Sequence, residues 1–217
     1  MSSDPPAPTA VETVAARLRE LILDAGIAPG APLREESLTA THGVNRHTVR
    51  AALRLLETER LVVIEPYRGA RVRAFTADEV RALLEYRTAL EAEAVRLLAD
   101  RAGSHPLALP AAVVEANDRL RAVCRSQPHE HRAIEAAHAA LHHALVAAAG
   151  SPRITEAHAL LESELLLFLN QLRPLLPADE MAEQHDRLLL DVAERGEQAV
   201  RDHLAHSAEQ LIGLLAR

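Results

Sequence analysis

The chain has 217 residues, 48% of them hydrophobic, which suffices for one large domain or two small ones and excludes disorder over most of its length. Aromatic residues make up only 2%, which disfavours a β-sandwich core and an aromatic platform for single-stranded nucleic acid. The single cysteine, Cys124, excludes an internal disulfide, and any metal must be held by histidine and carboxylate. No apolar run is long enough to span a membrane, and Met1–Thr9 lacks the features of a secretory signal, which predicts a cytoplasmic protein.

The net charge of −7 hides an asymmetry between two regions. Residues 1–74 hold 10 Arg against 9 acids, whereas residues 75–217 hold 14 Arg against 22 acids. Within 46–73 there are 7 Arg against 3 Glu, and lysine is absent from the chain. A basic segment inside an acidic protein is typical of a local nucleic-acid footprint.

The amino-terminal elements predict a winged helix-turn-helix. Residues 1–10 are rich in proline and predict a flexible arm, and residues 11–74 form the expected domain. Apolar periodicity and turn residues predict helices at 13–25, 33–41 and 45–58, with Asn45 as the cap of the third. Short strands at 61–64 and 70–73 would complete the domain as a hairpin.

The third helix is expected to read double-stranded DNA in the major groove. Arg46, His47 and Arg50 project from the face opposite its apolar stripe, where base-seeking side chains are needed. Arg34 and the wing residues Arg68 and Arg71 can reach phosphates or the minor groove. A solvated cationic surface is the alternative, but a cluster of six basic residues on one small module favours DNA.

The runs IAPGAPLREESL (27–38), GVNRHTVRAAL (43–53), LLE (55–57) and RGARV (68–72) closely resemble the winged helix-turn-helix of GntR-type bacterial transcription regulators. The resemblance implies that Arg34, Arg46, Arg50 and the wing tip at Gly69 contact DNA. This sequence departs from the pattern at Asn45 and at three other recognition-helix positions, which bears on the operator read and not on the activity. The full set of candidate DNA-contacting residues is Arg34, Arg46, His47, Thr48, Arg50, Arg68, Gly69 and Arg71.

The acidic region predicts a mainly α architecture. After a linker at 75–82, residues 83–217 are expected to form a helical domain. The resemblance to GntR regulators implies that this domain binds an effector and dimerises. Helical periodicity and breaks at proline and glycine predict a six- or seven-helix bundle. The expected helices lie near 76–101, 111–125, 130–149, 153–172, 178–195 and 197–215.

Histidines are concentrated in this region. His138 and His142 stand four residues apart, so both rings project from one helix face, a spacing by which a helix supplies two metal ligands. His185 and His203 lie on the last two helices and can face each other in a hairpin, although His206, one turn further on, could replace His203. The alternative is that His138 and His142 lie on the surface and share a helix face by chance, without binding a metal. The remaining histidines of the region read as residues of loops, surfaces or another helix face: His105, His129, His131, His143 and His158.

The segments EYRTALE (85–91), 138–152, EQH (183–185) and RDHL (201–204) look like the FadR-type (FCD) effector domain of GntR regulators. The resemblance implies a divalent metal held by His142, His185 and His203, with His138 at a position that is usually Asp. A fourth neutral nitrogen favours Zn²⁺ or Ni²⁺ over Mn²⁺. The resemblance also places Arg87 at the effector pocket, where it could grip a carboxylate; a surface pair with Glu91 is the alternative.

The sequence therefore predicts a homodimeric, ligand-responsive transcription regulator, and no enzyme. It would bind a near-palindromic operator, act as a repressor and sense a small carboxylate at a metal-containing pocket. One alternative is a regulator for which the metal itself is the signal. Another is a histidine-cluster metalloenzyme, for which no acid stands at a distinguishing spacing.

Overall fold

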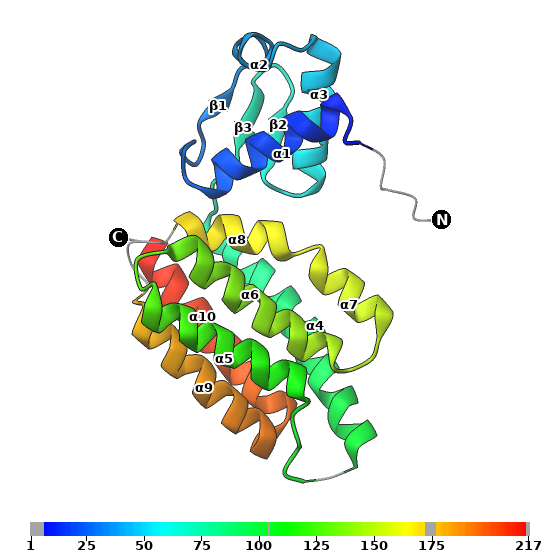
Figure 1. The fold of residues 1–217 in the computed structure, drawn as a ribbon, viewed down its shortest axis with the longest axis vertical. Coiled ribbons are helices and arrows are strands. Elements are labelled where there is room, and N and C mark those ends of the chain that lie inside the picture. Colours follow the sequence, from blue (N-terminus) through cyan, green and yellow to red (C-terminus); the bar gives the residue numbers. More distant parts are fainter. Residues whose placement is uncertain (1–6, 104, 172–176, 216–217) are drawn as a thin grey trace. The chain divides into compact units, whose positions relative to one another are not determined.

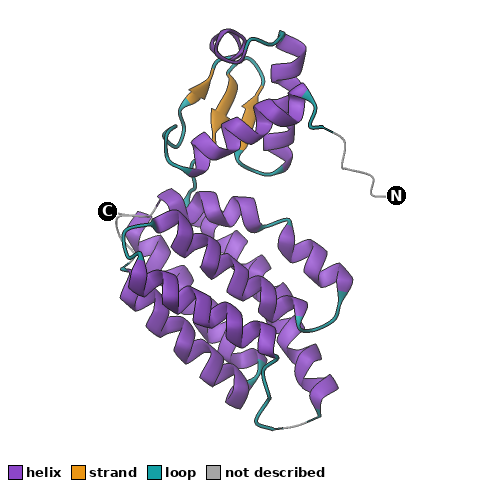
Figure 2. Ribbon diagram, viewed as in Figure 1, coloured by secondary structure: helices purple, strands orange, loops and turns teal. Residues whose placement is uncertain are grey.

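The computed structural model describes residues 7–103, 105–171 and 177–215, and the chain divides into two compact units, 1–74 and 75–217 (Figure 1). All described strands belong to the first unit, and the second is helical (Figure 2). The arm expected at 1–10 lies largely outside the described residues. Within the described ranges, no helix has both the length and the apolar character that a bilayer span requires.

In the first unit, the residues from 7 onward form three helices and a small antiparallel sheet. The elements in chain order are α1 (Ala10–Leu23), β1 (Pro32–Leu33), α2 (Glu35–His42), α3 (Arg46–Thr58), β2 (Val62–Glu65) and β3 (Gly69–Val72). The sheet order is β1-β3-β2, so the wing hairpin is joined on its β3 side by a two-residue strand. Strand β1 was not expected from the sequence, because two residues are too few to show the alternation of apolar and polar side chains that indicates a strand.

Side chains from α1 and α3 form the core of this unit. Leu18 and Ile22 of α1 pack with Val49, Leu53 and Leu56 of α3, all of them almost fully buried. This packing fixes which face of α3 remains outside. Burial of five such side chains contributes roughly 1.5–3 kcal/mol each to stability.

Local chemistry sets the helix boundaries. Asn45 Oδ1 accepts from the backbone N–H of Thr48 at 2.9 Å, which confirms the predicted cap of α3. Gly43 has φ 63°, the left-handed conformation that the turn before α3 requires. Helix α1 begins three residues earlier than predicted, because Thr9 and Glu12 form a reciprocal capping box at the end of the proline-rich segment.

In the second unit the described residues form seven helices. They are α4 (Ala77–Ala102), α5 (Ala111–Ser126), α6 (His131–Ala147), α7 (Pro152–Ala159), α8 (Glu162–Gln171), α9 (Ala178–Arg195) and α10 (Glu197–Leu215). Thr76 and Glu79 form a capping box at the start of α4, so helix begins within the segment 75–82 expected as a linker. The single helix expected at 153–172 is wrong, since the chain turns at 160–161 between α7 and α8.

Helix α4 lies along α10, and α5 lies between α6 and α9 (Figure 1). The apolar core between them includes Val95, Leu120, Leu145, Val192 and Leu204. Polar side chains are buried beside it, on the faces of α4, α6 and α9 that turn inward: Arg87, Glu91, His138, His142 and His185. The interior of the bundle thus contains a cluster of polar and charged side chains, at positions where apolar residues would normally be expected.

Candidate functional site

Helix α3 presents a cationic face to solvent. Arg46, His47 and Arg50 are exposed, whereas Val49 and Leu53 are buried on the opposite side. This arrangement confirms the two faces predicted from periodicity. Arg46 makes no ion pair with any described residue, so its guanidinium is available to a base edge or a phosphate.

Arg50 is held by the neighbouring helix. Its Nε donates to both carboxylate oxygens of Glu35 on α2, at 2.9 and 3.0 Å. The pair is exposed and therefore contributes little to stability. Both terminal nitrogens of Arg50 remain unbonded among the described residues, so the contact orients the guanidinium without occupying the groups that would read DNA.

The wing and its surroundings carry the other candidate DNA contacts. Arg34, Arg68, Gly69 and Arg71 are all exposed. Arg68 approaches Glu65 at 3.5 Å, and Arg71 Nη1 donates to the carbonyl of Gly30 at 3.1 Å.

Two uncharged residues also belong to this surface. Thr48 is half-buried and its hydroxyl donates to Asn45 Oδ1 at 3.2 Å, so it supports the cap of α3. Tyr67, which the sequence analysis did not select, is fully exposed at the turn of the wing with φ 66°. In the sequence, Tyr67 appears only as one residue of the turn Pro66–Gly69, and nothing there indicates that its side chain is exposed.

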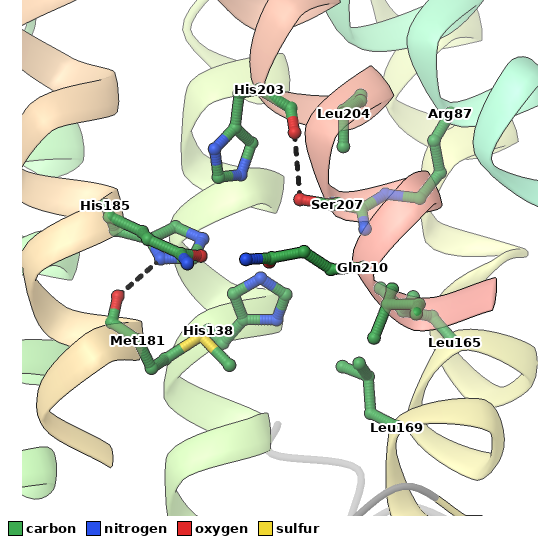
Figure 3. Close-up of a pocket in the computed structure, with 12 residues that line it drawn as sticks. Arg87, His138, Leu165, Leu169, Met181, His185, His203, Leu204, Ser207 and Gln210 are labelled. Carbon is green, nitrogen blue, oxygen red and sulfur yellow. Dashed lines mark hydrogen bonds between the residues drawn. The ribbon is translucent and has the colours of Figure 1, made fainter. Parts of the chain in front are cut away.

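In the helical unit, four histidines from three helices lie close together, and three of them, His138, His185 and His203, line one cavity. His138 and His142 come from α6, His185 from α9 and His203 from α10. One ligand nitrogen from each of His138, His142 and His185 lies within 4.8 Å of the others, and the ring centroid of His203 is 4.9 Å from that of His185. Figure 3 shows His138, His185 and His203 directed into this cavity. His206 is exposed and is not part of the cavity wall, which favours His203.

The hydrogen bonds of two rings fix their tautomers. His142 Nδ1 lies 2.7 Å from the carboxylate of Glu91, and His185 Nδ1 lies 2.7 Å from the carbonyl oxygen of Met181. Both acceptors lack a proton, so each Nδ1 carries the hydrogen and each neutral ring keeps its lone pair on Nε2. These two Nε2 atoms face one another at 3.1 Å.

Two lone pairs at this separation repel unless a cation lies between them. Nitrogens about 2.0–2.1 Å from one Zn²⁺ are about 3–3.4 Å apart at the usual bond angles, so the separation of the Nε2 atoms suits a shared metal. Nδ1 of His138 is also buried without a partner. The donor set therefore fits a divalent cation with nitrogen preference.

Burial and neighbouring charges keep this cluster neutral. Desolvation lowers the pKa values of His138 and His142, and it lowers the pKa of His185 to about 3. Neighbouring histidines and Arg87 further disfavour the positive form of His138 and His185, whereas the Glu91 carboxylate opposes the shift at His142 without cancelling it. Neutral imidazoles are the state in which histidine binds metal.

We expect the metal-free protein to lose stability as the pH falls from 8 to 5.5. The unfolded chain protonates His185 near pH 6.5, whereas the folded protein does so only near pH 3, so the unfolded state binds more protons and the free energy of unfolding falls. His185 alone accounts for about 1.4 kcal/mol at pH 5.5. The other histidines with lowered pKa values act in the same direction. Urea unfolding with chelator present measures the effect, and His185→Leu is expected to reduce it; a flat profile would contradict it.

Arg87 and Glu91 form a buried ion pair beside the histidines. The sequence had left open an exposed pair between them on the helix surface. Arg87 is 3% exposed and Glu91 is fully buried, and Arg87 Nε donates to Glu91 Oε1 at 2.7 Å. Arg87 also lines the histidine cavity, and its Nη2 is buried without a partner. One nitrogen of the guanidinium is thus anchored while another is left for a ligand.

The cavity itself is small. Its volume is about 40 Å³, which is space for roughly three water molecules. Beside the histidines and Arg87, its wall contains Leu165, Gln184, Ser207 and Gln210.

Sequence reasoning missed two buried residues of this region. His158 was expected at the surface, but it is 7% exposed and its Nε2 lies 3.1 Å from Glu91 Oε1. That expectation is wrong because α7 turns this single side chain into the bundle. The hydrogen-bonding role of Glu91 was also missed, since an Arg and a Glu four residues apart are most often an exposed pair. His105, His129 and His143 are exposed, as expected, and His131 is half-buried.

Comparison with known proteins matches both units. The family described as bacterial regulatory proteins, gntR family, matches residues 10–72, and the FCD domain matches residues 82–210. The chain is 29% identical over 201 residues to the probable D-xylose utilization operon transcriptional repressor of Paenarthrobacter nicotinovorans, covering 88% of this chain and 83% of that protein. It is 31% identical over 93 residues to the uncharacterized HTH-type transcriptional regulator YdhC of Bacillus subtilis strain 168, covering 43% of this chain and only 42% of that relative.

Solved structures show the same architecture. A GntR transcriptional regulator from Rhodococcus sp. RHA1 superposes with a TM-score of 0.73 at 27% identity, over 94% of this chain and 97% of that one. McbR/YncC of E. coli, at 19% identity, shares the fold with a TM-score of 0.67, over 97% of this chain and 98% of that one. The two domain matches together span most of the sequence, and the chain is therefore a DNA-binding transcription regulator of the GntR family that carries an FCD domain.

Proposed function

We propose that this regulator is a homodimeric repressor that releases its operator when a small carboxylate binds at a metal-containing pocket of the FCD domain. A two-fold dimer presents two copies of α3, and so it requires an operator with approximate two-fold symmetry. The similarity to a relative named as a transcriptional repressor supports the direction of control. The proposed DNA contacts are Arg34, Arg46, His47, Thr48, Arg50, Arg68, Gly69 and Arg71.

The proposed metal ligands are His138, His142, His185 and His203. The observation that carries this assignment is the pair of Nε2 lone pairs facing each other at 3.1 Å, each fixed by an Nδ1 hydrogen bond. Four neutral nitrogens and no carboxylate in the inner sphere favour Zn²⁺, with Ni²⁺ as the alternative. The cation would supply an anchor for an anionic ligand and would relieve the repulsion between the rings.

The proposed effector contact is Arg87. Its buried, unpartnered Nη2 needs an acceptor, and a carboxylate oxygen supplies one with opposite charge. The cavity of about 40 Å³ favours an acid of two or three carbons, or else a larger one that displaces the side chains of Gln210 or Leu165. A ligand bound jointly by the metal and Arg87 would bridge α4 to α6, α9 and α10.

The test is a titration of operator affinity. Duplexes enriched from a random pool by the full-length protein provide the operator, and binding is measured with chelator, with Zn²⁺, and with Zn²⁺ plus each member of a panel of two- to six-carbon carboxylates. We expect at least one acid to weaken binding about 10-fold, which needs a preference of only about 1.4 kcal/mol for the released state. Operator affinity that is the same under every condition would refute the sensing role.

The small cavity also supports a second candidate, in which the metal itself is the signal. Space for roughly three waters suffices to complete the coordination of an ion without an organic ligand. In that case Zn²⁺ or Ni²⁺ alone would change operator affinity, and the change would follow metal occupancy. The same titration separates the two candidates, because only the first requires the acid.

A further inference from the structure

We propose that Glu91 is a positioning residue that sets the metal affinity of the histidine cluster without touching the metal. The inference rests on the proposed metal site and adds to it a residue of α4 that acts through His142. Glu91 is fully buried, and its carboxylate is the meeting point of three side chains from three helices.

The contacts of Glu91 divide between its two oxygens. Oε2 accepts from His142 Nδ1 at 2.7 Å and from no other described residue. Oε1 accepts from Arg87 Nε at 2.7 Å and from His158 Nε2 at 3.1 Å. One oxygen is therefore reserved for the ligand ring, while the other is held in place by two donors from α4 and α7.

These contacts keep the carboxylate charged in the interior. Glu91 forms a buried ion pair with the guanidinium of Arg87, and its carboxylate also accepts from His142 and His158. A buried carboxylate without such partners would take up a proton instead. The three donors thus preserve a negative charge directly behind the His142 ring.

A charged acceptor behind a ligand ring has two effects on metal binding. It fixes the tautomer that leaves the Nε2 lone pair toward the metal, and it makes that nitrogen a stronger donor. By comparison, His185 is backed by the neutral carbonyl of Met181. Because no carboxylate is among the proposed ligands, Glu91 supplies the negative charge that an inner-sphere Asp would otherwise bring.

The geometry also couples Arg87, the proposed effector contact, to His142, a proposed metal ligand. Arg87 and His142 both donate to the carboxylate of Glu91. A ligand that moves the Arg87 guanidinium would therefore change the hydrogen bond that Glu91 accepts from His142. His158, the one buried residue of α7, adds an anchor for that helix. Removing His158 should loosen α7 while leaving the oxygen that contacts His142 in place.

The experiment measures Zn²⁺ affinity by chelator competition and records the absorption spectrum of the Co²⁺-loaded full-length protein. Glu91→Gln keeps the size of the side chain and an acceptor for His142 but removes the charge, and we expect the Zn²⁺ affinity to fall about 10-fold. Arg87→Met/Glu91→Leu removes the whole pair, and we expect a loss approaching about 100-fold. This double variant keeps the interior free of an unpaired charge, which protects its folding.

Two control variants accompany the Glu91 variants. Arg87→Met alone should weaken Zn²⁺ binding less than Arg87→Met/Glu91→Leu does, because His142 and His158 still donate to the Glu91 carboxylate. His158→Ala should change the Zn²⁺ affinity less than about threefold and leave the Co²⁺ spectrum unchanged. The spectrum of each Glu91 variant should differ from wild type, since the ligand strength of His142 has changed.

The outcomes distinguish this proposal from the metal site on which it rests. If the wild-type protein binds no Zn²⁺, or binds it equally well after His185→Ala, the metal site itself is wrong. If His185→Ala abolishes binding but both Glu91 variants bind Zn²⁺ as wild type does, with an unchanged Co²⁺ spectrum, only the positioning role of Glu91 is refuted.

Discussion

Replacing His185 with alanine is expected to remove most of the stabilisation of the protein by Zn²⁺. A ligand that binds only the folded state stabilises it by about 4 kcal/mol when its free concentration is 1,000 times the Kd. Loss of one of four nitrogens should weaken binding by more than the roughly 10- to 100-fold typical of residues that act from outside the ligand sphere. The difference in melting temperature between the Zn²⁺-loaded and the chelator-treated protein should therefore be much smaller for the variant than for the wild type.

The choice of His185 makes the result specific. Its Nδ1 donates to a backbone carbonyl, so alanine leaves no charged side chain unpaired, and it removes the repulsion between the two Nε2 atoms. Metal-free stability should consequently change far less than metal-bound stability. The matched control is His143→Ala, an exposed histidine of α6 beside the ligand His142, which should retain the full response. Equal stabilisation of wild type and His185→Ala by Zn²⁺ would exclude the site.

Patterns within single elements could be predicted from the sequence because local physics determines them. The buried stripe of α3, its Asn45 cap and the left-handed turn at Gly43 depend on neighbours within a few residues. The convergence of His138 and His142 follows from helical spacing alone. Their meeting with His185 and His203 was anticipated through the hairpin of the last two helices.

Features that depend on long-range packing could not be predicted in the same way. Strand β1 exists only because Pro32 and Leu33 pair with β3, some forty residues away. The break between α7 and α8 falls at 160–161, within a run of residues that contains no proline or glycine, so the sequence carries no local signal for it. Glu91 reads as half of an exposed pair until α6 and α7 cover it, which is why its role emerged only from the structure.

Arg50→Ala is expected to weaken operator binding at least about 30-fold and to relax sequence preference at one position of each half-site. An arginine that reads a base contributes about 1–3 kcal/mol, and a dimer uses two copies, so the loss per operator is about 2–6 kcal/mol. Affinities for the enriched duplex and for its single-base variants measure the effect. Unchanged discrimination among these duplexes would show that Arg50 does not read bases.

The exposed wing arginine provides the informative contrast. Arg68→Ala should weaken binding by a similar factor on every duplex, because a phosphate contact carries no sequence information, and it should reduce the salt dependence by about one ion per subunit. Arg153→Ala on α7, which is even more exposed than Arg68 and lies outside the first unit, should do neither. The three variants separate base reading from charge attraction. Loss of a base-reading side chain changes which duplex is preferred, whereas loss of a phosphate contact lowers the affinity and the salt dependence without changing that preference.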